Sequence, residues 1–576
     1  MSRLCKRSVG PVLALILAGG VCGAALARPN DDALAGTAVF ERFVYRGGDP
    51  AHEGLRPRPD QYLNPILQGF YPDPSITRAG DDYYLVTSTF SYFPGIPVFH
   101  SRDLVNWTQI GNAIDRPGQL DFGKLGLSRG VFAPTIEHRD GVFYILNTCV
   151  DCGGNFLVTA SDPAGPWSDP VWLPDLEGGI DPGLFFDEDG SAWIVNNGPP
   201  EGTPRYDGHR AIWIQRFDPA GRKTFGPRTV LVDGGVDPST RPIWIEGPHI
   251  IRRGDWYYLV CAEGGTAEGH SQVVLRSRRP DGPYEASPDN PILTQRGLPR
   301  DRTHPVTSAG HADLVQLPDG SWWATFLAVR PYGDDLYNTG RETFLLPVDW
   351  SGDWPRILEP GRAIPYLAAR PNLPRRPSAV PPTSGDFQVV DEFDGARLAP
   401  SWMMMRNPRD PWFDLTSHPG ALTLRMRSEG LGDNANPSFL GRRQQHQHAT
   451  AETILRDIPA REGDRAGLAV LQSDDYWYAL GAVRRDGRAL IELRRRRGAE
   501  TDSAGEVIAT APLGGEGPVR FRIAARAGAY DFAWARGEGP WTTLLEGADG
   551  EMLSTRVAGG FVGAVFGPFA QAGPPP

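Results

Sequence analysis

Three carboxylic acids and a histidine lie in short apolar runs that recur along the chain. Asp73 lies in YPDPSI, Asp181 in IDPGLF, Glu246 in IEGPHI and His311 in GHADLV. Two carboxylates that face each other across a sugar are the minimal machinery for hydrolysing a glycosidic bond, because one activates water and the other donates a proton. An aspartate before proline is common in turns, so each acid taken alone is better explained as a loop residue. Because such runs recur along the chain, a catalytic role becomes a better explanation of these acids than a turn.

The elements that would position these residues also repeat. Each polar residue is followed, after eight or nine positions, by a turn and an aromatic strand: GDDYYLV, DGSAWIV, RGDWYYLV and DGSWWATF. A fifth copy, APTIEH followed by DGVFYIL, has Ala133 and Pro134 where the others carry the polar residue. Counted at the turn, the copies advance in steps of 60, 49, 64 and 66 residues, at Asp81, Gly141, Gly190, Gly254 and Gly320.

Repeats of this size, rich in glycine and aromatic residues, predict a five-bladed β-propeller in which each unit is a four-stranded blade. The innermost strands then begin at the polar residues, and their side chains converge on one central cavity. A turn before an aromatic strand is also the commonest hairpin signal, which any all-β protein shows. The shared upstream run is what distinguishes these five copies from ordinary hairpins.

Composition sets the outer limits. The chain has 576 residues, which is too long for one ordinary core, so two domains are expected. Its 69 glycines and 55 prolines are typical of a β-rich and turn-rich protein. The net charge of −11 argues against a nucleic-acid partner or an anionic membrane, and it fits a neutral substrate. Whether the protein forms a homo-oligomer is left open.

The pattern divides the chain into five parts. We expect a signal peptide over residues 1–27, an irregular N-terminal segment over 28–63 and the propeller over 64–357. A proline-rich linker over 358–386 follows, containing ARPNLPRRPSAVPPTSG, and it is expected to be a connector without a fold of its own. Residues 387–576 alternate between apolar and polar positions, which predicts a β-sandwich.

The N-terminus has the three parts of a secretory signal. Arg3, Lys6 and Arg7 are followed by the apolar run VLALILA and then by the small-residue site Ala25–Ala27. The mature chain is therefore expected to begin near Arg28 and to be exported to the periplasm or outside the cell. Cys22 raises the alternative of a lipoprotein, although Gly19-Gly20-Val21 before it is a poor acylation signal.

Three cysteines remain after the signal: Cys149, Cys152 and Cys261. In an oxidising compartment the closely spaced pair Cys149 and Cys152 is expected to form a local disulfide, with two free thiols as the alternative. A redox motif would need a helix N-terminus to lower a thiol pKa, and the sequence shows none at this place.

Longer stretches of the chain resemble glycoside hydrolase family 43 and, more closely, its two-domain β-xylosidase and α-L-arabinofuranosidase members. In the first domain the resemblance is carried by NPILQGFYPDPSI, FAPTIEHRDGVFY, GGIDPGLFFDEDG, IEGPHIIRRGDWYYLVCAEGGTAEGH, AGHADLV and TGRETFLLPVDW. It continues in the second domain through PGALTLRMR, FLGRRQQHQHATAET and GGFVGAVF. The resemblance implies a five-bladed propeller followed by a concanavalin-like sandwich, and an inverting mechanism.

The resemblance also implies a role for each acid. Asp73 would be the general base, Glu246 the general acid, and Asp181 the carboxylate that adjusts the pKa of the acid and orients the substrate. Arg341, in GRET, would hydrogen-bond both the sugar and Asp73 and keep the base ionised. The simpler explanation of Arg341 from sequence alone is a surface arginine.

Further residues would complete the pocket. The resemblance implies a calcium ion in the channel beside His311, with a buried core histidine as the simpler reading. Thr266, in EGGT, would lie at the rim, and Phe561, in GGFVGAV, would close the mouth from the second domain. No organic cofactor is expected.

Apolar walls are a further expectation, since Phe90, Phe93 and Phe132 could line the pocket, although aromatic residues of a propeller are as often blade core. Phe132 stands where the family has tryptophan, and the pair Cys149 and Cys152 has no counterpart in the family pattern. Only 15 residues follow Phe561, which leaves open whether the sandwich is complete.

The sequence therefore predicts an exo-acting, inverting glycosidase that releases a terminal pentose, with β-D-xylose from xylo-oligosaccharides ahead of α-L-arabinofuranose or a dual specificity. A secreted carbohydrate-binding protein without activity is the alternative from another class, and a structural β-protein is a third. The set of acids with Arg341 favours the enzyme, because a lectin does not need it.

Overall fold

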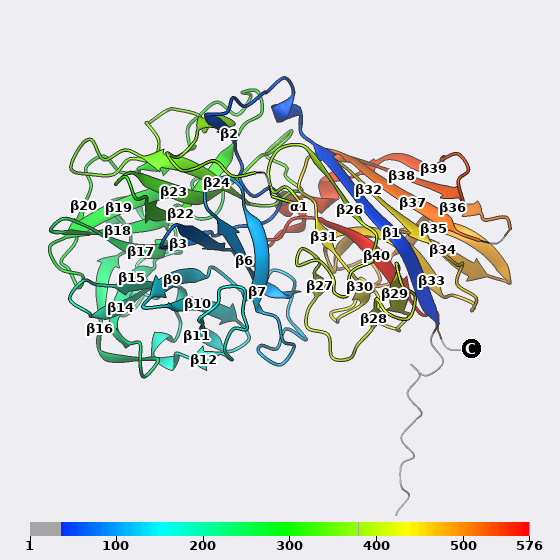
Figure 1. Cartoon of the computed structure of the whole chain (residues 1–576), viewed down its shortest axis with the longest axis horizontal. Coiled ribbons are helices and arrows are strands. Elements are labelled where there is room, and N and C mark those ends of the chain that lie inside the picture. Colours follow the sequence, from blue (N-terminus) through cyan, green and yellow to red (C-terminus); the bar gives the residue numbers. More distant parts are fainter. Residues whose placement is uncertain (1–35, 378, 516, 575–576) are drawn as a thin grey trace, which may run out of the picture.

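A computed structural model describes residues 36–574 apart from 378 and 516. The predicted signal peptide, with Cys5 and Cys22, lies outside the described residues. Figure 1 shows a propeller and a β-sandwich side by side, which is the predicted all-β architecture.

The propeller has five blades. The first contains β3 (Ser75–Ala79), β4 (Asp82–Val86), β6 (Gly95–Ser101) and β7 (Thr108–Ile114). The second contains β8 (Gly130–Val131), β9 (Thr135–Arg139), β10 (Val142–Val150), β11 (Gly154–Ala160) and β12 (Val171–Trp172). The third contains β13 (Ile180–Phe186), β14 (Ala192–Gly198), β15 (Ala211–Asp218) and β16 (Lys223–Asp233). The fourth contains β17 (Glu246–Arg253), β18 (Trp256–Glu263), β19 (Ser271–Ser277), β20 (Glu285–Ala286) and β21 (Leu293–Thr294), and the fifth contains β22 (Thr307–Gln316), β23 (Trp322–Val329) and β24 (Glu342–Val348).

The innermost strands β3, β9, β13, β17 and β22 form a closed ring, in which each strand contacts the next and the last contacts the first. The chain before the first blade closes this ring onto the fifth. Leu67 pairs with Thr343 of β24, and the Asn64 side chain donates to the Leu345 carbonyl (2.9 Å) and accepts from its N–H (3.0 Å). These bonds satisfy backbone groups that an open edge strand would expose.

The sandwich has two antiparallel sheets. One runs in the order β28 (Phe413–Asp414), β29 (Leu422–Arg425), β1 (Thr37–Gly48), β32 (His448–Leu455), β37 (Val519–Arg526), β38 (Ala529–Arg536) and β39 (Thr542–Asp549), with β26 (Phe387–Asp391) also paired to β1. The other runs β30 (Ser438–Phe439), β40 (Val565–Gln571), β33 (Arg465–Ser473), β34 (Tyr476–Arg485), β35 (Arg488–Arg497) and β36 (Glu506–Pro512), with β31 (Arg442–Arg443) paired to β40. In β37 buried and partly exposed residues alternate, as the pattern predicts for a sheet with one covered face.

The N-terminal segment 28–63 is not irregular as predicted, because residues 37–48 form the long strand β1. This strand lies inside a sheet of the sandwich and pairs with β32, for example Phe43 with Thr453. Figure 1 shows β1 in dark blue running through the yellow to red strands of the second domain. Its apolar residues are buried there, so the chain begins in the sandwich and then crosses to the propeller.

The proline-rich linker 358–386 also has more structure than predicted. Residues 367–369 form β25, which pairs with β2 (Gln61–Leu63), and Asp386 accepts a hydrogen bond from the Asp49 N–H (3.1 Å). The linker is therefore fixed along the propeller at its start and to the end of β1 at its finish.

The two domains are held by buried contacts. β5 (Tyr92–Phe93) of the propeller pairs with β27 (Met404–Met405). Arg330 is buried and donates two hydrogen bonds to Glu342 (2.6 and 2.8 Å) while it also pairs with Asp49. A buried charge is costly unless it is paired in this way, so the network ties β24 to the end of β1.

The last strand among the described residues is β40. β40 pairs along its length with β33 and takes an inner place in its sheet. The only α-helix among the described residues is α1 (Thr555–Ala558), and no helix within them combines the length and the apolar character needed to cross a membrane.

Candidate active site

A pocket of about 530 Å³ opens at the centre of the ring of blades, within the usual size range of small-molecule sites. The structure brings together here nine of the ten residues for which the sequence predicted a role. They are Asp73, Phe90, Phe132, Asp181, Glu246, Thr266, His311, Arg341 and Phe561.

The starts of four of the five innermost strands share an unusual backbone conformation. Asp73, Asp181 and His311 have positive φ angles of 57°, 53° and 53°, and in the fourth blade the residue with this conformation is Gly247 (φ 55°). Aspartate visits this region more readily than most residues. The prediction that Glu246 lies at the matching place is therefore wrong by one position.

A β-bulge explains the offset. In β17 the pairing is regular at Glu246 and resumes at His249, and in β13 it is interrupted in the same way after Ile180. Bulges redirect side chains near active sites, and here the residue before the bulge carries the acid. Gly247 must be glycine, because a Cβ there would lie 2.7 Å from Nε2 of His311.

One corner of the pocket stabilises an ionised Asp73. The carboxylate accepts hydrogen bonds from Arg341 Nη1 (3.1 Å) and Ser88 Oγ (2.5 Å), and His311 Nδ1 lies 3.7 Å away. Burial alone would raise the pKa of Asp73, but Arg341, His311 and Ser88 outweigh it and hold the pKa below its ordinary value. Burial lowers the pKa of His311 itself to about 4, so at neutral pH the imidazole is uncharged and Arg341 and Ser88 are the groups that stabilise the carboxylate.

The other corner favours protonated acids. Burial, followed by the charges of Asp181 and Asp73, raises the pKa of Glu246 well above its ordinary value. Burial and the charge of Asp73 raise the pKa of Asp181 to about 7, although the carboxylate accepts a hydrogen bond from the Gly247 N–H (3.3 Å). Two buried carboxyl groups with opposite shifts are what a general base and a general acid need.

Three phenylalanines meet at the mouth. Phe90 and Phe561 are stacked at 5.8 Å, and Phe132 meets them edge-on at 5.6 and 5.7 Å. Phe561 comes from the sandwich, and its N–H donates to Ser128 Oγ of the propeller (2.9 Å). Phe93 does not line the pocket as expected; it is buried in the core where β5 pairs with β27.

Cys149 and Cys152 form the predicted disulfide, and Cys261 is a buried free thiol. The loop that the disulfide closes contributes to the pocket wall, since Val150 lines the pocket and Asp151 accepts a hydrogen bond from Arg129 Nε (2.6 Å). Arg129 also lines the pocket and lies over the ring of Phe132 (5.8 Å). The two departures from the family pattern are thus neighbours in space.

Sequence reasoning missed several residues of the mouth. Ile243 and Trp244 line the pocket just ahead of Glu246, and Arg210 lies behind Trp244 with its guanidinium 4.7 Å from the centre of the ring. The aromatic residue in IWIEGP, two positions before Glu246, was a sequence signal that could have predicted Trp244 as a pocket residue. Arg210, in GHRAIW, lies far from Trp244 in sequence and had no such signal.

The calcium predicted beside His311 finds little support in the side chains. Within the described residues no group of three or more His, Cys, Asp or Glu side chains could hold a metal ion. His311 would be a single side-chain ligand whose neighbour Asp73 is already occupied by Arg341. We therefore derive no step through a metal.

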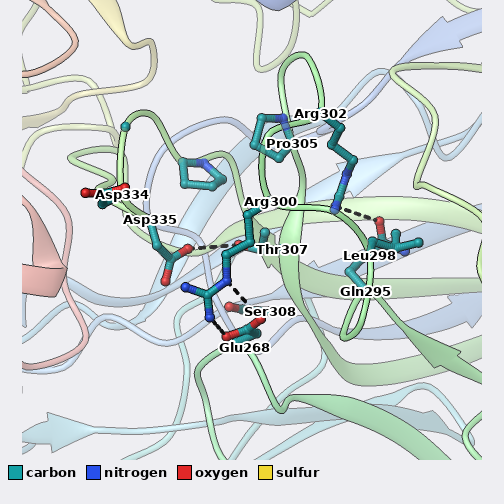
Figure 2. Close-up of a pocket in the computed structure, with 12 residues that line it drawn as sticks. Glu268, Gln295, Leu298, Arg300, Arg302, Pro305, Thr307, Ser308, Asp334 and Asp335 are labelled. Atoms are coloured by element: carbon teal, nitrogen blue, oxygen red, sulfur yellow. Dashed lines mark hydrogen bonds and ion pairs between the residues drawn. The ribbon is translucent and has the colours of Figure 1, made fainter.

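A second pocket, of about 70 Å³, lies among loops of the fourth and fifth blades and holds none of the predicted residues (Figure 2). Several of its polar side chains are paired with one another. Arg300 pairs with Glu268, Arg302 donates to Gln295 (3.4 Å) and Thr307 donates to Asp335 (3.4 Å). It is too small for a sugar ring, so the central pocket is the candidate active site.

A ring of blades around two oppositely tuned acids is the arrangement of a glycosidase, and comparison with known proteins agrees. Residues 62–355 match the model of "Glycosyl hydrolases family 43", and residues 390–575 match "Beta xylosidase C-terminal Concanavalin A-like domain". The chain belongs to glycoside hydrolase family 43.

Similar proteins cover most of the chain. A "Xylosidase/arabinosidase" of Butyrivibrio fibrisolvens is 41% identical over 423 residues, which are 73% of this chain and 80% of that protein. A "Non-reducing end alpha-L-arabinofuranosidase" of Bacteroides ovatus is 38% identical over 517 residues, 88% of this chain and 91% of that protein. The crystal structure of a family 43 protein retrieved from a capybara gut metagenome is 37% identical, with a TM-score of 0.85, and covers 92% of this chain and 99% of that one.

Proposed function

We propose that this protein is an exo-acting, inverting glycosidase that releases terminal β-D-xylose from xylo-oligosaccharides. The observation that carries the proposal is the opposite pKa shift of two buried acids that line one pocket, with Asp73 lowered and Glu246 raised. An inverting enzyme needs one ionised and one protonated carboxyl group at neutral pH.

In this mechanism Asp73 takes a proton from a water molecule, which attacks the anomeric carbon from the face opposite the leaving group. Arg341 and Ser88 hold the carboxylate in place through the bonds described above. The buried Nε of Arg341 has no protein partner among the described residues. A hydroxyl group of the sugar would satisfy it, so Arg341 both orients the substrate and keeps the base ionised.

Glu246 donates its proton to the glycosidic oxygen as the bond to the leaving sugar breaks. At the end of the reaction Asp73 holds a proton and Glu246 has lost one, and exchange with solvent restores both. Asp181 raises the pKa of Glu246 by its charge.

The exo action follows from the closed mouth. Phe561 reaches across from the sandwich and packs against Phe90, with the Arg341 guanidinium 5.3 Å from its ring. A pocket capped in this way accepts one terminal sugar, whereas an endo-acting enzyme needs a cleft that is open at both ends. Release of α-L-arabinofuranose is the second candidate, favoured by the name of the Bacteroides ovatus relative.

The test is hydrolysis of 4-nitrophenyl β-D-xylopyranoside and 4-nitrophenyl α-L-arabinofuranoside side by side, with the product of xylobiose followed by proton NMR. We expect the xyloside to be the better substrate and the first xylose released to be the α anomer. Faster arabinoside hydrolysis would transfer the proposal to the second candidate, and first release of the β anomer would contradict inversion. Repeating the assay after EDTA treatment tests whether calcium contributes.

We also propose that the protein is exported, on the basis of its N-terminal pattern and the Cys149–Cys152 disulfide. Cell fractionation followed by N-terminal sequencing should find the protein outside the cytoplasm, beginning near Arg28. An intact N-terminus on a cytoplasmic protein would contradict export.

A further inference from the structure

Trp244 is an exposed aromatic residue at the mouth of the pocket. Trp244 keeps 36% of its surface exposed, and the neighbouring Ile243 keeps 52%. Trp244 lines the catalytic pocket and also a wider groove of about 490 Å³ formed with residues 204–210. Trp244 is therefore shared by the pocket and the groove, and it lies where one leads into the other. Exposed apolar surface in such a place is typical of a binding site.

The indole ring of Trp244 is held in position by a strained backbone conformation. Trp244 has a φ angle of 46°, a conformation that bulky residues rarely adopt. Its N–H donates to the Gly208 carbonyl (3.0 Å), and the Arg210 guanidinium lies over one face of the indole. Strained conformations that the surroundings enforce are concentrated at functional sites.

Arg210 is itself fixed. Its Nε and Nη2 donate to Asn197 Oδ1 (2.9 and 2.7 Å), and Nη2 also reaches the Gly178 carbonyl (3.1 Å). Asn197 in turn donates to the Ile245 carbonyl (2.6 Å), directly before Glu246. The same network thus positions the exposed indole and the start of the strand that carries the acid.

The position relative to Glu246 determines what the indole can meet. A general acid must reach the glycosidic oxygen, so the leaving sugar lies beyond that oxygen on the acid's side of the pocket. Trp244 is two residues before Glu246 and leads from that side into the groove. An aromatic ring offers a flat apolar surface to the C–H groups on the face of a pyranose.

We propose that Trp244 is the platform of a subsite for the leaving sugar, a neutral pyranose, and that the groove over residues 204–210 receives the sugar that follows it. This inference rests on the proposed function and adds to it the residue that selects an oligosaccharide over a small leaving group. Trp244 is a specificity-determining residue and takes no part in proton transfer.

The experiment compares xylobiose and xylotriose with β-D-xylopyranosyl fluoride, whose leaving group is too small to reach Trp244. Trp244→Ala should lower kcat/KM for both oligosaccharides about tenfold, mainly through KM, and leave the fluoride within about twofold of the wild type. Trp244→Tyr, which keeps an aromatic face, should recover most of the loss. Phe225→Ala is the matched control, because Phe225 is also exposed and lies under an arginine, Arg216, but is on the outermost strand of its blade.

Three results would overturn the inference. Equal losses on the fluoride and the oligosaccharides would place Trp244 against the sugar that is released, and unchanged oligosaccharide kinetics would remove it from the binding site. A wild-type enzyme that hydrolyses neither the fluoride nor xylobiose would overturn the proposed function and this inference with it. Circular dichroism and thermal unfolding of each variant distinguish loss of the subsite from loss of the fold.

Discussion

The two sides of the pocket are equally buried and electrostatically opposite. Asp73 and Glu246 expose 5% and 7% of their surface, yet one has a lowered and the other a raised pKa. Asp73 has Arg341 and Ser88 within hydrogen-bonding distance, whereas the negative charges of Asp181 and Asp73 outweigh Arg341 and Arg210 at Glu246.

The difference shows that burial raises the pKa of both acids and that neighbouring groups then decide which one is ionised at neutral pH. A single propeller supplies both electrostatic environments because its innermost strands all begin at one cavity. Arg341 enters from the fifth blade and Asp181 from the third, so the assignment of roles depends on blades other than those that carry Asp73 and Glu246. The predictions below change one side at a time.

Replacing the base should have the largest effect. Asp73→Asn removes the group that activates water and should lower kcat by about 10³-fold or more on every substrate, whatever its leaving group. Steady-state kinetics on xylobiose and on 4-nitrophenyl β-D-xyloside would measure it. A variant that keeps a substantial part of its activity would remove Asp73 from the role of base.

Replacing the acid should have a large effect only where the leaving group needs a proton. Glu246→Gln should lower the rate on xylobiose by about 10²–10³-fold and spare aryl xylosides with good leaving groups. The comparison of leaving groups within one variant controls for misfolding. Equal losses on both classes would contradict the role of acid.

Removing the cation beside the base should alter the pH dependence as well as the rate. Without the positive charge of Arg341, burial dominates and the pKa of Asp73 rises, so Arg341→Met should move the acidic limb of the kcat/KM profile to higher pH. Arg341 also lowers the pKa of Glu246, so the alkaline limb should move in the same direction but by less, because the charges of Asp181 and Asp73 act more strongly on Glu246 than Arg341 does. An acidic limb that stays in place would show that Arg341 only binds the sugar.

Removing Phe561 from the mouth of the pocket should lower the activity less than the three changes above. Phe561→Ala removes the ring that packs on Phe90 and should lower kcat/KM about tenfold, mainly through KM. Val557→Ala, an exposed position on α1 in the same region of the sandwich, is the control. Unchanged kinetics would show that the sandwich does not contribute to binding.

The smallest effect is expected from the disulfide loop. Cys149→Ser with Cys152→Ser frees the loop that holds Arg129 through Asp151 and places Val150 at the wall, so KM should rise a few-fold with little change in kcat. A reducing agent should reproduce the change in the wild type and have no effect on the double variant. A loss of kcat at constant KM would contradict a role confined to the mouth.

The blades and the site residues could be predicted because both follow from local patterns. Each aromatic strand follows its own turn, and each acid lies in the run before that turn. The repeat alone was therefore enough to predict that Asp73, Asp181 and Glu246 share one cavity. The family resemblance added Arg341 and Phe561, which no repeat contains.

Long-range pairing and backbone detail could not be predicted in this way. β1 pairs with a strand some 400 residues later in the chain. The sequence of β1 alone does not indicate which strand it pairs with. The one-residue offset of Glu246 depends on a bulge that only the pairing with β18 reveals. The role of Trp244 could not be predicted either, because it depends on the position of Arg210, which comes from another blade.

The pH dependence of kcat/KM for the wild type and for Asp181→Asn tests most directly whether neighbouring charges assign the roles. Asp181 raises the pKa of Glu246 by its charge, so its removal should lower that pKa and move the alkaline limb to lower pH while the acidic limb of Asp73 changes much less. An alkaline limb that stays in place, or an acidic limb that moves instead, would contradict the assignment of Glu246 as the acid tuned by Asp181.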